Sequence, residues 1–538
     1  MIIFAFCILL ALCIILLFVL YQHAHSKFVK NVRGEKSYSY GTKDCTTQLD
    51  FCLQDLALNN DGLGYKKNAI ALIKENIDAF AARILAAKMA GRSLDLMYYI
   101  FEDDRVGKLL LHELVQAANR GVRVRLLIDD INVGARDPIF RALDKHPNIE
   151  IRLFNPCRAR GFNVKRVIEF VLRAVSLTRR MHNKAYIADG RIAFVGGRNI
   201  ADAYFGASEN SNARDLDVML SGPVVSEVED IFDLYWNSDV VVPIHGLVLT
   251  IGPRGLEYWE EYLRKYRNFN INKTLVDDIN NMSFYHFLRP NKYLFAVENV
   301  RVLSDPPEKA MKKQNKSWLV HFLFSCLEQA TRDVQITSPY FVPGVWGVEQ
   351  LTSLVNKGIN VSVLTNSLAT TDVAATYGGY IHYRKELLEY GIKLYELRPP
   401  SIEYSNKFII RNNRRRKKPP KLHFLVRHTS NLHTKAFLID KYKAFVGSFN
   451  FDMRSVVLNT EMGVYFECKP LAAHMDILFY EEISPLMSYR LTATRNGEIN
   501  WVFREGNRTT FSTYEPDVSL FRRLLVRFVR LLPIKSQL

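Results

Sequence analysis

Cysteine is scarce in this chain, with 7 among 538 residues. No two cysteines have the spacing of zinc ligands, and two of them, Cys7 and Cys13, lie inside an apolar N-terminal run. The cysteines therefore form no recognisable metal motif, and their small number agrees with a reducing compartment. A bridge between Cys45 and Cys52 is the alternative that an oxidising location would allow.

Acidic residues are also in short supply, 55 against 72 lysines and arginines, which gives a formal net charge of +17. Such an excess predicts a polyanionic partner, and charge alone does not choose between an anionic membrane surface and nucleic acid. The hydrophobic fraction of 48% and the charged fraction of 24% are typical of globular proteins. The length allows two or three domains, each with its own core.

Charged side chains are absent from residues 1–20, an apolar run that is long enough as a helix to cross a bilayer core of about 30 Å. The run also lacks the preceding positive charge and the small-x-small exit of a cleavable signal peptide, so we expect a retained transmembrane anchor over residues 1–22. Immediately downstream lie Lys27, Lys30, Arg33 and Lys36. The positive-inside bias then predicts a single-pass protein whose body is cytoplasmic.

Two stretches of the chain share one pattern, MHNKAYIADGRIAFVGGRN and LHTKAFLIDKYKAFVGSFN. At identical intervals they place His182, Lys184, Asp189 and Asn199 in the first, and His433, Lys435, Asp440, Ser448 and Asn450 in the second. Because side chains alternate along a strand, the His and the Lys of each stretch point to the same face. Each Asp opens a hairpin turn, which gives it a structural role as the alternative to a catalytic one.

The surrounding pattern of strands and helices also occurs twice. It predicts a helix, strand, helix and strand over residues 69–89, 94–101, 107–120 and 122–128, and again over 317–330, 334–337, 348–357 and 361–365. A longer interval before the second His matches the polar, basic stretch 406–420, which we interpret as a loop insertion. We therefore expect a duplicated α/β unit whose halves pack about a pseudo-two-fold axis and bring both His-Lys faces to one cleft.

Two imidazoles and two ammonium groups at one cleft suit the chemistry of a phosphodiester. Lys184 and Lys435 are expected to bind the non-bridging oxygens and to offset the charge that develops there. One imidazole attacks phosphorus, while the other protonates the leaving oxygen and then activates the incoming alcohol. Neutral hydrogen bonds to the same oxygens are expected from Asn199, Ser448 and Asn450. Two histidines can perform this transfer with no metal or other cofactor.

A nucleophilic imidazole also needs an acid on its second ring nitrogen, which holds the ring in one tautomer. Aligning the two halves downstream of the motifs sets Glu461 against Asp215, and these two are the candidates for orienting the histidines. Asp217, two residues further along, is the alternative.

The doubled His-x-Lys-x4-Asp pattern with its Gly-x-x-Asn tail resembles the phospholipase D superfamily. The stretches MYYIFEDD, GVRVRLLIDD, SPYFVP, LTNSLATTDVA, GSFNFDMRSVVLNTEMG and NGEINWV look more closely like the bacterial cardiolipin synthases of the C type, and the likeness covers nearly all of the chain from about residue 69. It implies an α/β fold of two phospholipase D-like α-β-α sandwich halves related by a pseudo-two-fold. Gly197 stands where the superfamily often has Ser.

The resemblance implies transfer of a phosphatidyl group from phosphatidylglycerol or phosphatidylethanolamine to phosphatidylglycerol through a phosphohistidine, in the bacterial inner membrane. His182 is then the nucleophile and His433 the acid, an order that the residues alone do not give. The implied catalytic set is His182, Lys184, Asp189, His433, Lys435 and Asp440. A phospholipase D-type phosphodiesterase that hydrolyses lipid or nucleic acid is the alternative. Intact His and Lys in both halves argue against a third reading, a silent lipid-binding scaffold.

The expected organisation has five parts: a transmembrane anchor (1–22), a first phospholipase D-like domain (68–240), a connecting segment (241–300), a second phospholipase D-like domain (301–510) and an amphipathic basic helix (516–534). That helix has leucines and phenylalanines on one side and arginines on the other, so it either lies in the membrane interface or caps the globular body. The basic run at 411–421 is either a loop that attracts anionic lipid or a solvated one.

Overall fold

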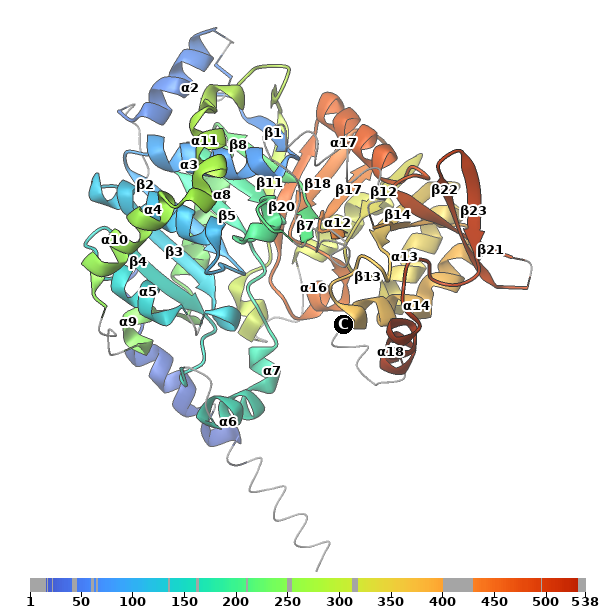
Figure 1. Ribbon diagram of the computed structural model, residues 1–538, viewed down its shortest axis with the longest axis horizontal. Helices are drawn as coiled ribbons and strands as arrows, with labels where there is room; N and C mark the ends of the chain where they lie inside the picture. Colours follow the sequence, from blue (N-terminus) through green and yellow to red (C-terminus); the bar gives the residue numbers. More distant parts are fainter. Residues whose placement is uncertain are drawn as a thin grey trace, which may run out of the picture.

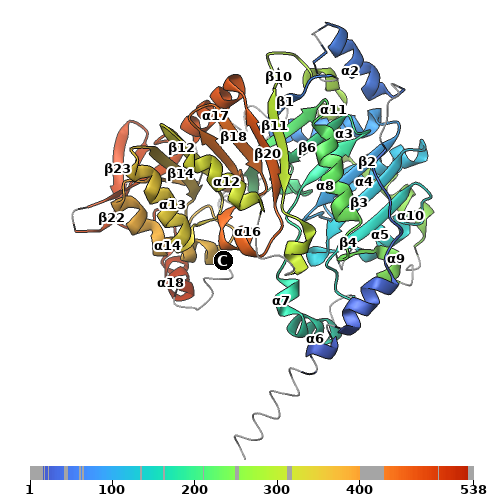
Figure 2. The same ribbon diagram turned by 180° about the vertical axis from the view of Figure 1, so that it is seen from behind.

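The computed structural model describes residues 16–530 except 17, 22, 41–45, 60–61, 64–65, 134–135, 161–163, 210, 249–253, 312–317, 400–428 and 495. Two α/β lobes lie side by side (Figure 1), the first in blue to green and the second in yellow to red. The view from behind shows the same two lobes with their sheets meeting at a central seam (Figure 2). The predicted duplication is confirmed.

The first lobe is built on a nine-stranded sheet with the order β10-β1-β8-β6-β5-β2-β3-β4-β9. Its strands are β1 (Ala69–Ile73), β2 (Ser93–Tyr98), β3 (Arg123–Asp129), β4 (Ile149–Phe154), β5 (Ala185–Ala188), β6 (Ile192–Gly196), β8 (Asp217–Ser221), β9 (Val241–Pro243) and β10 (Leu294–Ala296). Strands β2, β3 and β4 are parallel, and β5 joins β2 in the antiparallel direction. The start of β5 therefore lies at the carboxyl edge of the parallel strands.

The helices of this lobe are α2 (Gln48–Asn59), α3 (Asn76–Met89), α4 (Arg105–Asn119), α5 (Asp137–Leu143), α6 (Val164–Leu172), α7 (Ala174–Leu177), α8 (Val225–Trp236), α9 (Ile244–Leu247), α10 (Leu256–Arg267) and α11 (Asn270–Asn280), with 3-10 turns η1 (Asp130–Asn132), η2 (Asp202–Tyr204) and η3 (Phe284–His286). Helix α4 begins where the Asp104 carboxylate accepts a hydrogen bond from Gly107 N. Residues of α3, α4 and α5 pack into one hydrophobic cluster with the sheet, and those of α8 pack into another.

The second lobe repeats this plan with a ten-stranded sheet of order β11-β20-β18-β17-β12-β14-β15-β21-β22-β23. Its strands are β11 (Asn299–Ser304), β12 (Asp333–Thr337), β14 (Asn360–Asn366), β15 (Lys393–Leu397), β17 (Ala436–Ile439), β18 (Lys443–Gly447), β20 (Met462–Glu467), β21 (Ser488–Ala493), β22 (Ile499–Glu505) and β23 (Arg508–Ser512). The other elements are β13 (Phe341–Val342), β19 (Phe451–Asp452), η4 (Pro307–Met311), α12 (Trp318–Glu328), α13 (Gly344–Asn356), α14 (Ala374–Glu389), α16 (Met453–Val457), α17 (Lys469–Glu482) and α18 (Leu520–Arg530).

The two lobes share backbone pairing and a core. Strand β7 (Ser211–Arg214) of the first lobe pairs in parallel with β16 (Thr429–Leu432) of the second. One hydrophobic cluster includes Leu127 and Phe232 from the first lobe together with Leu438 and Val464 from the second. The two lobes are therefore joined by a shared hydrophobic core as well as by backbone pairing, and they form one body.

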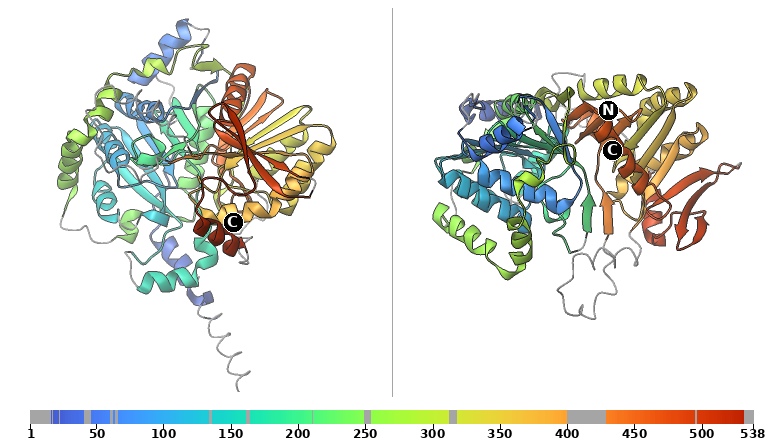
Figure 3. Two further views of the ribbon diagram at one scale, coloured as in Figure 1. Left: turned by 45° about the vertical axis from the view of Figure 1, so that its right-hand side comes forward. Right: turned by 90° about the horizontal axis from the view of Figure 1, so that it is seen from above.

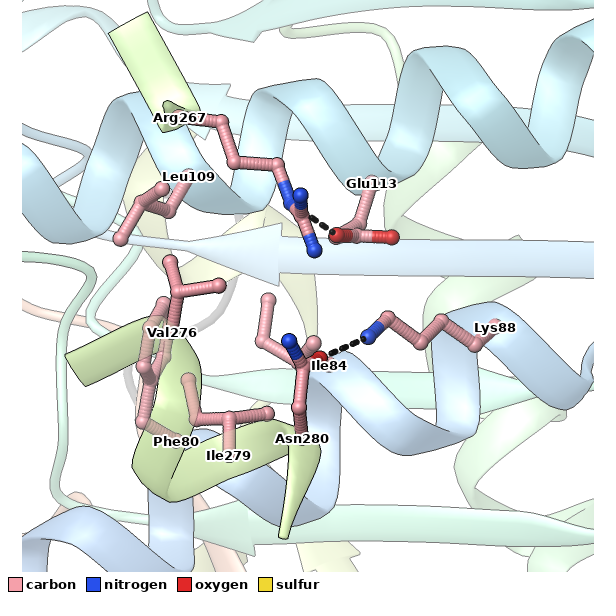
Figure 4. A pocket seen from close by; sticks show the side chains of 9 residues that line it. All are labelled: Phe80, Ile84, Lys88, Leu109, Glu113, Arg267, Val276, Ile279 and Asn280. Carbon is pink, nitrogen blue, oxygen red and sulfur yellow. Dashed lines mark hydrogen bonds and ion pairs between the residues drawn. The ribbon is translucent and has the colours of Figure 1, made fainter. Parts of the chain in front are cut away.

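Two predictions about elements are wrong. Residues 69–89 form the strand β1 followed by the helix α3 instead of one helix, because β1 is buried between β8 and β10. The predicted connecting segment belongs to the first lobe, since β9 and β10 are edge strands of its sheet. Its helices α10 and α11 pack on α3 and α4 around a small hollow of about 10 Å³ (Figure 4), where Arg267 pairs with Glu113 and Lys88 donates to Asn280.

Three predictions concern the ends of the chain and the long insertion. The expected anchor at residues 1–22 lies largely outside the described residues, and among those that are described no helix is long and apolar enough to cross a bilayer. The basic stretches 406–420 and 411–421 lie wholly outside them. The amphipathic helix is present as α18, and its leucines and phenylalanines are exposed, which contradicts the reading that they cap the body.

Candidate active site

The two motif histidines begin equivalent strands and face the seam. His182 precedes β5 and His433 precedes β17, each at the carboxyl edge of its parallel strands. The backbone N–H of His182 donates to Thr460 O at 2.9 Å, and that of His433 donates to Arg214 O at 2.7 Å. Each histidine is therefore fixed by a carbonyl from the other lobe.

The carboxylate partners of the histidines are also exchanged between the lobes. His182 Nδ1 lies 2.8 Å from Glu461 Oε2, and His433 Nδ1 lies 2.6 Å from Asp215 Oδ2. Both carboxylates are fully buried. Glu461 and Asp215 thus occupy the positions predicted for acids that orient the rings, and each acts on the histidine of the opposite half.

The two lysines stand beside their own histidines. Lys184 Nζ donates to His182 O at 2.6 Å, and Lys435 Nζ donates to His433 O. Burial lowers the pKa of Lys435 to about 8, and it also lowers the pKa of Lys184, with the charge of Lys435 adding to the effect there. Because the charge of Lys435 acts on Lys184, the two ammonium groups lie near each other, and the cluster is suited to an anion.

The two imidazoles are also affected by the charges of the lysines. The pKa of His182 is lowered by burial and then by Lys184, Lys435 and His433. The pKa of His433 is also lowered, by burial and by Lys435, although Asp215 opposes the shift. Both rings are therefore neutral near pH 7 while no anion compensates the lysines, and the four motif side chains form one electrostatic cluster.

The surroundings of the two carboxylates differ. Glu461 accepts hydrogen bonds from Ser448 Oγ at 2.5 Å and Ser455 Oγ at 2.8 Å, and burial raises its pKa to about 7. Burial opposes ionisation of Asp215 as well, but His433, Lys435 and Arg198 together outweigh it, and the pKa of Asp215 is lowered. The hydroxyl of Ser448, predicted to bind phosphate, is instead committed to Glu461.

The two motif asparagines are buried in the site. Asn199 Oδ1 accepts from the backbone N–H of Ile100 at 3.2 Å. Asn450 Oδ1 accepts no hydrogen bond from any described residue. The amide of Asn450 therefore keeps capacity for a further partner.

Asp189 and Asp440 lie outside this cluster, and the prediction that they are catalytic is wrong. The Asp189 carboxylate accepts backbone N–H groups of Gly91, Arg92 and Ser93, and Asp440 is bonded in the same way by residues 331–333. Both have positive φ, 55° and 52°. Since each lies at the far end of its strand from the histidine, the turn-forming alternative is the right one.

Asp217, the alternative orienting acid, is a structural ion pair. Its Oδ2 lies 2.7 Å from Arg83 Nη2 and 3.4 Å from Arg198 Nη1, and all three side chains are buried. Asp215 lies just before β8 and is bound to His433, so the two acids have different partners although they are only two residues apart.

Some residues around the site were missed or misjudged from the sequence. Tyr99 meets the His182 ring edge-on at 5.0 Å between centroids, in agreement with packing at the cleft, and Tyr204 meets His433 in the same way at 4.8 Å. Nothing in the sequence marked Tyr204, which lies in a 3-10 turn.

A matched pair of polar side chains also supports the histidines. At the end of β3 the Asp129 carboxylate accepts from Met181 N, and at the end of β14 the Asn366 carbonyl accepts from Leu432 N, both at 2.9 Å. Met181 and Leu432 are the residues just before the two histidines. The signal that could have found the pair is a polar residue at the end of each central buried strand. No group of three metal-ligating side chains gathers in the described part of the chain.

Comparison with known proteins gives consistent results. A family profile described as "Cardiolipin synthase, PLD-like domain" matches residues 83–236 and 323–483, one segment in each lobe. Cardiolipin synthase C of Escherichia coli (strain K12) is 39% identical over 467 residues, which cover 86% of this chain and 94% of that protein. Major cardiolipin synthase ClsA of Bacillus subtilis (strain 168) is 24% identical over 439 residues, 81% of this chain and 73% of that protein.

A solved structure has the same fold. The crystal structure of phosphatidylserine synthase from Haemophilus influenzae Rd KW20 matches with a TM-score of 0.54 and covers 91% of this chain and all of that one. At 13% sequence identity this likeness concerns the fold alone.

Proposed function

Because the chain belongs to the family of cardiolipin synthases with phospholipase D-like domains, and is therefore an enzyme that transfers phosphatidyl groups, we propose that it makes cardiolipin from phosphatidylglycerol through a phosphohistidine. The observation that carries the proposal is the meeting of both His-Lys pairs at one buried seam with exchanged carboxylates. The proposed donor is phosphatidylglycerol, releasing glycerol, or phosphatidylethanolamine, releasing ethanolamine.

In the first step His182 Nε2 attacks the phosphorus of the donor, and the bond from phosphorus to the headgroup oxygen breaks. That oxygen takes the proton of His433 Nε2 and leaves as an alcohol. His182 suits attack because its lowered pKa keeps the ring neutral and Glu461 holds Nδ1. His433 suits proton donation because an ionised Asp215 stabilises the imidazolium that arrival of the phosphodiester favours.

In the second step a hydroxyl of phosphatidylglycerol replaces the departed alcohol. His433, now neutral, takes the proton of that hydroxyl, its oxygen attacks phosphorus, and the bond to His182 breaks. The same residues thus act in both directions, as microscopic reversibility requires. Exclusion of water decides whether an alcohol or water reaches the phosphohistidine first, and the buried seam favours the alcohol.

Lys184 and Lys435 are proposed to hold the two non-bridging oxygens, together with the amides of Asn199 and Asn450. A phosphodiester anion between the lysines would stabilise both ammonium groups, whose pKa values burial lowers. Ser448 acts through Glu461 and so is a positioning residue. The enzyme is proposed to work at the bacterial inner membrane with its body on the cytoplasmic side.

The test is to reconstitute the chain in vesicles that contain labelled phosphatidylglycerol, with and without phosphatidylethanolamine, and to follow lipid products and released alcohol. Cardiolipin with stoichiometric glycerol or ethanolamine is the expected result, and the alcohol identifies the donor. Phosphatidic acid without cardiolipin would replace the proposal with a lipid hydrolase. Cleavage of DNA with untouched lipid would replace it with a nuclease.

A further inference from the structure

Helix α6 carries its apolar side outward. Val164, Val167, Ile168 and Val171 recur at helical spacing and are 52–74% exposed. Glu169, the acid of this helix, is instead buried, where its carboxylate accepts from the backbone of Arg158 and Ala159 and pairs with Arg173. A helix that covers a soluble core has the opposite polarity, so this face is built for an apolar environment.

Helix α18 has the same inverted polarity. Its exposed apolar side chains are 42–76% accessible and comprise Leu520, Phe521, Leu524, Leu525 and Phe528. Val526 is buried against the body. Arg522 donates to Thr371 O at 2.5 Å and Arg523 donates to Glu515 O at 2.9 Å. The helix is thus fixed by Val526 and by its arginines, while its leucines and phenylalanines are not covered by any described residue.

Both helices lie at the edge of the sheets where the histidines begin. Helix α6 connects the carboxyl end of β4 to the start of β5, which follows His182. Helix α18 is bound to the loop after β14, the strand whose last residue, Asn366, supports the residue before His433. Figures 1 and 2 agree that α6, below the first lobe, and α18, below the second, lie at the same end of the molecule, and Figure 3 (left) shows the dark red α18 and the teal α6 and α7 at that end.

The charges around these faces are cationic. Lys165 and Arg166 lie on α6, and α18 carries Arg522, Arg523, Arg527 and Arg530 with no acid between residues 520 and 530. The helical residues 23–31 also pack at this end, where the guanidinium of Arg158 lies 4.5 Å from the Phe28 ring centroid. They follow the apolar sequence of residues 1–20 directly.

We propose that the outward faces of α6 and α18 form one docking surface that inserts into an anionic phospholipid monolayer and brings the seam to the headgroups. The proposal rests on the lipid substrate of the proposed function. A membrane fits better than a protein partner, because two separate helices with apolar ridges and flanking arginines match an apolar layer beneath anionic headgroups. The surface would let headgroups reach the histidines while the acyl chains stay in the bilayer.

The first experiment is site-specific photo-crosslinking in the full chain, reconstituted in vesicles of phosphatidylcholine and phosphatidylglycerol. A photo-reactive phenylalanine analogue replaces Ile168 or Phe521, and mass spectrometry identifies the adducts. Lipid adducts at both positions, and none when the analogue replaces Leu58 on α2, are expected. Leu58 is 79% exposed and α2 lies at the opposite end of the molecule. Adducts to protein alone, from a second copy or another chain, would overturn the proposal.

The second experiment compares two substrates for the variant that combines Val167→Ser, Ile168→Ser, Phe521→Ser and Leu525→Ser. Its kcat/KM on vesicle phosphatidylglycerol should fall about tenfold or more, since four side chains lose apolar burial. Its rate on short-chain, monomeric phosphatidylglycerol should stay within about twofold, which shows that the variant is folded.

The matched control carries Phe51→Ser and Leu58→Ser, both on α2, and should behave like the unmodified chain on both substrates. Equal rates of the four-site variant and the unmodified chain on vesicles would overturn docking. If the unmodified chain turned over neither lipid, the proposed function would fail, and the crosslinking result would still decide the docking surface.

Discussion

His182 and His433 have the same side chain, but their acids give them different work. The pKa of Glu461 is raised to about 7, whereas the pKa of Asp215 is lowered. In the proposed mechanism, an ionised Asp215 makes His433 the better proton donor, and His182 is left as the nucleophile. This asymmetry gives a physical reason for an order that the residue types alone could not supply.

The assignment predicts different sensitivity to the leaving group. His182→Ala should abolish turnover with every substrate, because no atom replaces the attacking nitrogen. His433→Ala should lose turnover of phosphatidylglycerol by about 10²-fold or more but recover much of it with phosphatidyl-p-nitrophenol, whose leaving group needs no proton. Initial rates on the two substrates measure this. Recovery in the His182 variant in place of the His433 variant would reverse the assignment.

A substitution at Gly197 would test the role of Asp215 in the pair that it forms with His433. A Cβ at this position would lie 2.6 Å from Asp215 Oδ1, so Gly197→Ala should displace the carboxylate from His433. We expect a fall of about tenfold or more with phosphatidylglycerol and a smaller one with the nitrophenyl substrate. Gly255→Ala is the control, since nothing lies within 4 Å of its Cβ. Unchanged rates in the Gly197 variant would show that catalysis does not depend on the observed position of the Asp215 carboxylate.

Lys435 predicts the alkaline limb of the pH profile. Its pKa of about 8 in the free enzyme means that the ammonium is present below pH 8 and is lost as the pH rises through that value. The value of kcat/KM should therefore fall above about pH 8, while kcat should hold to higher pH because a bound phosphodiester raises the pKa of the lysine. Lys435→Gln should lower kcat/KM by about 10²-fold and remove the limb. If kcat/KM of this variant still fell above about pH 8, the titration of a group other than Lys435 would cause the fall.

At the scale of elements, the ends of β3 and β14 hold the residues that precede the histidines. Asp129→Asn keeps an acceptor for Met181 N and mimics Asn366, but it leaves the buried Arg180 without its carboxylate. We expect activity within a few fold and a loss of about 1–3 kcal/mol in stability. Asp129→Leu removes the acceptor and should lose activity as well. Thermal unfolding and kcat separate the two effects, and equal kcat for both variants would deny Asp129 a positioning role.

The same scale shows what sequence patterns can predict. Alternation along the motif strands predicted a common face for each His-Lys pair, and the bounds of α4 and β3 lie within two residues of those predicted. The short strand β1 was hidden in an alanine-rich run because its burial between β8 and β10 depends on residues far along the chain. Helix α6 was missed because its apolar spacing lies inside a basic stretch, and tertiary packing of Glu169 and Arg173 defines it.

At the scale of the whole molecule, the duplication predicts the seam between the lobes. It does not predict which acid pairs with which histidine across that seam. Nothing in one half indicates that Glu461 serves His182 and Asp215 serves His433, since that exchange depends on how the halves dock. The parallel pair β7–β16 and the shared hydrophobic cluster tie each lobe to the site of the other. Neither lobe alone contains a complete histidine and acid pair, so activity is a property of the docked molecule.

This dependence predicts that an anion stabilises both lobes together. Inorganic phosphate or tungstate should bind between Lys184 and Lys435 and offset two buried cations whose pKa values burial has lowered. Saturation at a hundred times Kd adds about 2.7 kcal/mol, and because one core spans the seam the whole chain should unfold in a single transition at a higher Tm. Scanning calorimetry with chloride at equal ionic strength separates binding from screening. The double variant Lys184→Gln, Lys435→Gln should lose the shift, and a shift confined to one of two transitions would mean that the lobes bind and unfold independently.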